Sequence, residues 1–159
     1  MVVSHVLVGA GAWVAAARLG GMVSGDALAV GAAMAGSLLP DIDHPSSWLG
    51  RRLWVVSKPL SKLIGHRGLT HSLLAVVGGL ALVQAIHPST VVARLAEPLV
   101  VGYLSHLAAD ALTPAGVPLL WPLKRRFRLP LCASGGAMEL LVVLAFLAAV
   151  GWFVTSGSV

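Results

Sequence analysis

The chain has 159 residues, of which 57% are hydrophobic and 11% are charged, and its mean hydropathy is +0.89. An ordinary soluble domain carries about 25% charged residues, so this chain has too little polar surface to cover a water-soluble globule. Its length predicts one membrane-embedded domain over residues 1–159. The single cysteine, Cys132, excludes an intramolecular disulfide and a cysteine-based zinc site.

Five apolar segments follow one another along the chain, and we predict that each is a membrane-spanning helix of an all-α bundle. They cover about residues 6–19, 27–40, 69–86, 98–112 and 137–154. A spanning helix needs roughly 17 to 25 apolar residues, which the third and fifth segments provide. The other three are short, and runs of that length also form core helices. The absence of a polar stripe favours spans, because every face can then meet lipid or another helix.

Local signals predict where these helices begin. Asp26 is a suitable cap for the second, Glu97 and Pro98 place an acid and a proline at the start of the fourth, and Ser134 with two glycines precedes the fifth. A secretory signal peptide over residues 2–21 is the alternative for the first segment. That stretch lacks a basic n-region and carries a histidine at position 5, so we favour a retained helix.

The basic residues indicate an orientation in the membrane. Five spans would place the N-terminus and the loops 41–68 and 113–136 on one side. Nine of the eleven Lys and Arg residues lie there, and only Arg18 and Arg94 lie on the other side. The positive-inside rule therefore predicts a cytoplasmic N-terminus and an external C-terminus.

The same topology gathers ionisable side chains at the cytoplasmic end of the bundle. Ionisable groups buried in a bilayer are costly, so their recurrence at one depth on separate segments indicates a functional site. His87 is left out of the candidate ligands, because this topology places it on the opposite side of the membrane. We predict that the metal ligands come from eight residues: His5, Asp41, Asp43, His66, His71, His106, Asp110 and Glu139.

The first motif, Asp41-x-Asp43-His44, lies where an apolar helix has just ended. Side chains can converge from such an irregular turn, and oxygen donors together with imidazole suit zinc, manganese or iron. The alternative is a polar helix terminus that meets water.

Two further motifs contain histidines. His66 and His71 are five residues apart and converge only if His66 precedes the helix, a bend that Gly68 permits; the alternative is an interfacial loop with incidental histidines. His106 and Asp110 share a helix face at i and i+4. Both can bind one ion, or the carboxylate can orient the imidazole; the alternative is a buried hydrogen bond that only joins helices.

The remaining candidates are less specific. Glu139 lies in the first turn of its segment, where an acid favours the helix dipole without any ligand. Arg51 or Arg67 could bind a phosphate bidentately, although basic clusters beside a membrane are commonly explained by topology and by anionic lipids. The basic residues are not interleaved with aromatic ones, so nucleic-acid binding is not predicted. The chain has no nucleophile elbow, Walker loop or His-Glu-x-x-His motif.

Three stretches in combination resemble one known family. They are LPDIDHP at 39–45, GHRGLTHS at 65–72, and GYLSHLAAD at 102–110 with Thr113; His5 and Gly135-Gly136 with Glu139 agree as well. On these residues the chain resembles the YdjM-like family of bacterial inner-membrane proteins, described as metal-dependent hydrolases. The resemblance spans nearly the whole chain. It implies a multi-pass protein of a bacterial or archaeal inner membrane with a metal site, distantly similar to zinc-dependent phospholipase C.

Our main hypothesis is a membrane-bound metal-dependent hydrolase that acts on a lipid-linked phosphoester at the cytoplasmic face. One or two divalent ions, zinc or else manganese or iron, would activate a water. Asp43 would act as general base, and Arg51 or Arg67 would hold the phosphate. The expected partners are membrane lipids and a lipid substrate; no feature of the sequence specifies an oligomeric state.

The rival hypothesis is a non-enzymatic metal transporter or sensor that uses the same residues. Two features count against it: the ionisable groups crowd one end of the bundle instead of crossing it, and the segments show no internal repeat. A purely structural helix bundle is a third possibility, which stoichiometric metal binding would exclude.

Overall fold

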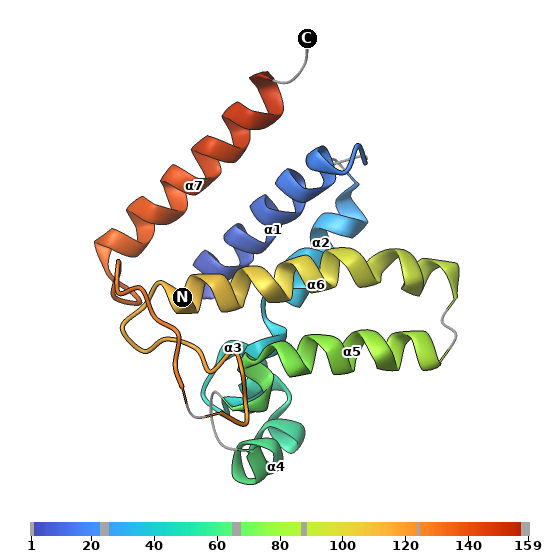
Figure 1. Cartoon of the computed structure of the whole chain (residues 1–159), viewed down its shortest axis with the longest axis vertical. Helices are drawn as coiled ribbons and strands as arrows, with labels where there is room; N and C mark the ends of the chain where they lie inside the picture. Colours follow the sequence, from blue (N-terminus) through green and yellow to red (C-terminus); the bar gives the residue numbers. More distant parts are fainter. Residues whose placement is uncertain (1, 23–25, 65–67, 87–88, 124, 157–159) are drawn as a thin grey trace.

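The computed structural model describes residues 2–22, 26–64, 68–86, 89–123 and 125–156, and in these ranges the chain is helical without a β-strand (Figure 1). The prediction of an all-α membrane bundle is confirmed. The elements in order are α1 (Val2–Leu19), α2 (Ala27–Gly36), η1 (Leu39–Asp43), α3 (Trp48–Arg52), α4 (Trp54–Ile64), η2 (Leu69–His71), α5 (Leu73–Ala85), α6 (Thr90–Ala111) and α7 (Ala137–Ser156).

Three of the described helices, α1, α6 and α7, are long and apolar enough to cross a membrane. Helices α2 and α5 have 10 and 13 residues, which at 1.5 Å per residue is about 15 and 20 Å. The hydrocarbon core of a bilayer is about 30 Å thick, so the predicted count of five spans is not confirmed. Three and five are both odd, so either count leaves the termini on opposite sides, and the predicted orientation stays a prediction.

Several helix boundaries differ from the prediction. Helix α6 begins at Thr90, where Ser89 accepts a hydrogen bond from the Val92 N–H, and the predicted start at Pro98 was wrong. Pro98 lies buried inside the helix; a proline removes one backbone hydrogen bond, and spanning helices tolerate this loss. Helix α5 begins only at Leu73, because the residues before it form the turn η2. The cap at Asp26 is confirmed by its hydrogen bond with the Leu28 N–H, 3.0 Å long.

Glycines allow α2 and α6 to approach each other closely. A Cβ atom at Gly102 of α6 would overlap the backbone carbonyl of Ala33, and one at Gly36 of α2 would overlap the backbone of Leu99. Small residues at such crossings allow helices to pack through their backbones in a bilayer. The crossing brings the end of α2 against the last turns of α6.

The polar ends of the helices gather at one place. The N-terminus of α1 lies beside the C-terminal part of α6, and α5 starts close to the same region (Figure 1). Both 3-10 turns join this group, since η1 contacts η2, α2 and α6. The start of α1, the end of α6, η1 and η2 can therefore contribute side chains to one site.

Candidate metal centre

Five of the eight predicted ligands meet at this junction. His5 comes from α1, Asp41 from η1, His71 from η2, and His106 and Asp110 from α6. His5, His71, His106 and Asp110 are buried, with at most 7% of each residue exposed, and Asp41 is half-buried. Among the described residues they form two candidate ligand groups that share one histidine: His5, His106 and Asp110, and Asp41, His71 and His106.

Asp110 faces three imidazoles with its two oxygens. Its Oδ1 lies 3.7 Å from His5 Nε2. Its Oδ2 lies 3.7 Å from His71 Nε2 and 3.8 Å from His106 Nε2. The two oxygens of this carboxylate therefore face different imidazoles, and Asp110 would be a ligand of any ion held here.

Asp41 completes the second group. Its Oδ1 lies 3.8 Å from His71 Nε2 and 4.0 Å from His106 Nε2. These separations are longer than a normal hydrogen bond. Two donors bound to one zinc ion at about 2.0–2.2 Å can lie at most about 4.4 Å apart, so the observed separations leave room for a cation between the donors.

A backbone hydrogen bond sets the tautomer of His106. Its Nδ1 lies 2.7 Å from the Ser37 carbonyl oxygen, which can only accept, so Nδ1 carries the proton. In the neutral ring Nε2 then presents its lone pair to Asp41 and Asp110. A metal-binding histidine is oriented in the same way, through a hydrogen bond from its other nitrogen. The donor set therefore fits a divalent cation.

His71 is oriented by a chain of two side chains that ends at Asp43. The Thr70 hydroxyl donates to Asp43 Oδ2 at 2.6 Å and lies 3.1 Å from His71 Nδ1. Its one hydrogen is used by Asp43, so it accepts from the ring N–H, and His71 Nε2 is left as the donor atom facing Asp110. The Tyr103 hydroxyl donates to the Thr70 carbonyl and holds this turn against α6.

Asp43 thus lies outside both ligand groups and acts on His71 through Thr70. The Asp43 residue is fully buried. Sequence reasoning missed Thr70 and Tyr103. The available signal was the position of Thr70 directly before His71 in the GHRGLTHS motif.

The other predicted site residues that the structure describes, Glu139 and Arg51, are not members of the two ligand groups. Glu139, in the first turn of α7, is half-buried and accepts a hydrogen bond from the Gly135 N–H. Arg51 is exposed on α3. His66 and Arg67 lie outside the described residues.

Replacing Thr70 with valine should weaken metal binding about 10- to 100-fold, the usual effect of losing a group that orients a ligand. Valine keeps the volume but cannot accept the proton on His71 Nδ1. Thr70→Ser should restore the affinity, and Thr155→Val, an exposed change at the end of α7, should leave it unchanged. The measurement is zinc titration against a competing chelator; equal affinities for Thr70→Val and wild type would contradict the assigned relay.

Comparison with known proteins identifies the family of this chain. The family model described as YdjM inner membrane protein matches residues 1–158. The chain belongs to the YdjM family. It is 52% identical over 112 residues to the inner membrane protein YdjM of Escherichia coli (strain K12), a match that covers 68% of this chain and 57% of that protein. It therefore spans little more than half the length of this relative.

A more distant relative belongs to a different bacterium. The chain is 38% identical over 110 residues to the uncharacterized protein YvsG of Bacillus subtilis (strain 168), covering 69% of this chain and 67% of that protein. No solved structure matches the chain significantly. Membership of the family, together with three helices of spanning length, makes this chain an inner membrane protein.

Proposed function

We propose that this YdjM-family chain is a metal-dependent hydrolase that cleaves a lipid-linked phosphoester at the cytoplasmic face of the inner membrane. The observation that carries the proposal is the position of Asp110, whose two oxygens face the Nε2 atoms of three buried histidines. Such a set can hold one or two ions. A bound zinc, manganese or iron ion lowers the pKa of its water and polarises a phosphoryl oxygen.

The other groups have separate roles in this proposal. His5, Asp41, His71, His106 and Asp110 hold the metal, and Asp43 positions His71 through Thr70. Arg51, together with Arg67, remains the candidate for holding the phosphate. Glu139 is our choice of general base: it lies outside the ligand groups, and a cavity wall contains it together with His5 and Asp110.

The proposal is tested with protein purified in detergent and loaded with zinc or manganese. We expect turnover of phospholipid or isoprenoid phosphate that a chelator abolishes and that added metal restores. Stoichiometric metal without turnover on any lipid phosphoester would contradict it and favour a non-enzymatic metal-binding protein.

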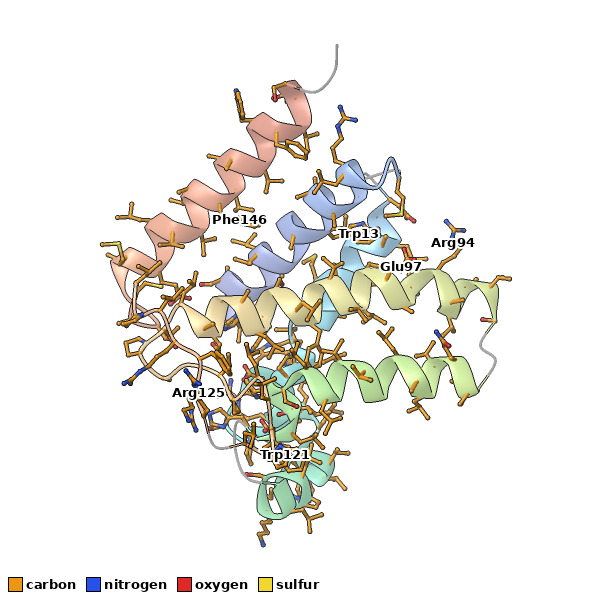
Figure 2. All side chains as sticks on the ribbon, in the orientation of Figure 1. Trp13, Arg94, Glu97, Trp121, Arg125 and Phe146 are labelled. Carbon is orange, nitrogen blue, oxygen red and sulfur yellow. The ribbon has the colours of Figure 1, made fainter. Side chains whose placement is uncertain are left out.

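Glu139→Gln should keep the metal but lower turnover about 10²- to 10⁴-fold, the usual contribution of a general base. The matched control is Glu97→Gln, an exposed residue on α6. Glu97 lies 13 residues before Asp110 on this helix, about 20 Å away, in the same part of α6 as Arg94 (Figure 2). Wild-type turnover in Glu139→Gln would exclude Glu139 as the base.

A further inference from the structure

A cavity of about 300 Å³ adjoins the metal centre. Its wall is formed by α1, α6, α7 and the segment that joins α6 to α7, and it includes His5 and Asp110. The three helices are those with the length and composition to cross the membrane. The cavity therefore runs from the metal ligands into the spanning part of the protein.

The wall changes from polar to apolar along its helices. On α1 it passes from Ser4 and His5 to Val8 and Ala12, over about 12 Å at 1.5 Å per residue. On α7 it passes in the same direction, from Glu139 through two valines to an aromatic ring; these residues are Glu139, Val142, Val143 and Phe146. The polar groups thus lie at the end nearest the metal ligands, and the deep end is apolar.

The deep end is closed where α1 and α7 touch. A Cβ atom at Gly11 would lie 2.9 Å from Phe146 Cε1, so the two helices are in close contact at this point and a larger residue there would displace the ring. Phe146 lies between the two helices (Figure 2). Cavities that hold small ligands measure about 300–1,000 Å³, so this one is at the lower limit and has room for one slender chain.

We infer that this cavity binds a single hydrocarbon chain of the substrate, alkyl or prenyl, with its phosphate head at His5 and Asp110. The position of the head rests on the proposed function; the chain site rests on the cavity itself. A charged or polar occupant would leave its hydrogen bonds unmade at the apolar end, among Val8, Ala12 and Phe146. On the α6 side, Ala108 is both exposed and part of the wall, so a chain can enter directly from the bilayer.

The single cysteine provides a reporter that does not depend on activity. Cys132 is 8% exposed and forms part of the cavity wall, so an occupant should shield it from N-ethylmaleimide. The full-length, zinc-loaded protein would be kept in digitonin, whose rigid ring system does not fit a slender cavity. The probes are octyl phosphate, geranyl phosphate and inorganic phosphate, and the readout is the rate of Cys132 modification.

We expect octyl or geranyl phosphate to give half-protection at a concentration roughly 100-fold or more below that of inorganic phosphate, since each buried CH₂ strengthens binding about fourfold. Protection by only one of the two would identify the chain as alkyl or prenyl. The inference would be overturned if all three probes gave half-protection of Cys132 at the same concentration. It would also be overturned if neither octyl nor geranyl phosphate protected Cys132.

Variants that fill the apolar end provide the second test. Ala12→Leu and Val8→Phe should remove the advantage of octyl phosphate over inorganic phosphate while the bound zinc remains. Ala148→Leu is the matched control, the same change at an exposed position of α7, and should keep the advantage. An unchanged advantage in both filling variants would overturn the inference.

The two proposals fail separately in these experiments. Protection by an octyl chain in a protein that binds no metal and hydrolyses nothing would remove the proposed function and leave the chain site. Chelator-sensitive turnover without protection of Cys132 by octyl or geranyl phosphate would remove the chain site and leave the proposed function.

Discussion

Replacing Asp110 with asparagine should lower zinc affinity by more than about 100-fold, beyond the 10- to 100-fold loss typical of an outer-shell change. The carboxylate faces His5 with one oxygen and faces His71 and His106 with the other. An asparagine has one oxygen and one NH₂ group, which has no lone pair for a metal. Whichever way the amide turns, its NH₂ group faces either His5 or the pair His71 and His106, so one side of the centre loses its carboxylate oxygen.

The measurement is metal content after dialysis against a weak chelator, with thermal unfolding as a check that the bundle is intact. Asp26→Asn is the matched control, because Asp26 is an exposed cap at the start of α2, 3.9 Å from Arg94. It should retain stoichiometric metal. Stoichiometric zinc in Asp110→Asn would show that the carboxylate is no ligand, and the centre described above would then be a structural hydrogen-bonded cluster.

The sequence predicted the members of this site better than their roles. His106 and Asp110 were recognisable as a pair from their spacing on one helix. His5, Asp41 and His71 were predicted because each lies near the start or end of an apolar segment, on the same side of the membrane. The spacing on one helix and the position at a segment end can both be taken from the sequence alone. They succeed because a membrane leaves few places for charged groups.

The roles depend on backbone geometry that no periodicity encodes. Asp41 and Asp43 are two residues apart in the 3-10 turn, yet Asp41 faces the imidazoles of His71 and His106, while Asp43 accepts a hydrogen bond from Thr70. The turn exists because α2 ends at Gly36 and not at Pro40, which lies inside η1. A sequence pattern that is apolar through residue 40 gives no sign of this change from one helix type to the other.

The prediction for the loop 41–68 was also incomplete. It contains two short helices, α3 and α4, in a region that we predicted only as a loop between spans. Ser47 caps α3 by accepting a hydrogen bond from the Gly50 N–H at 2.9 Å, a signal that was available in the sequence. The five residues of α3 are too few for a hydrophobic period to reveal them.

The approach of α6 to α2 determines whether the centre can form at all, and Gly102→Ala tests this. The new Cβ would overlap the Ala33 carbonyl, so α6 must move away from α2. Overfilling a packed interface costs about 1–3 kcal/mol, which for a chain of this size lowers the melting temperature by roughly 2–12 °C. His106 lies one turn further along α6 and would be drawn away from the Ser37 carbonyl, so metal affinity should fall as well.

Gly31→Ala separates this effect from the general preference of helices for alanine. Gly31 lies on α2, and a Cβ atom added there would have no neighbouring atom within 4 Å, so the new methyl group meets nothing. This variant should be neutral or more stable by up to about 1 kcal/mol, with wild-type zinc affinity. The comparison uses melting temperature and zinc titration on the same samples. If Gly102→Ala melts and binds zinc like Gly31→Ala, the close crossing does not hold the ligands in place. If it loses both stability and metal, the backbone contact between α2 and α6 supports the imidazole of His106, because no ligand was changed.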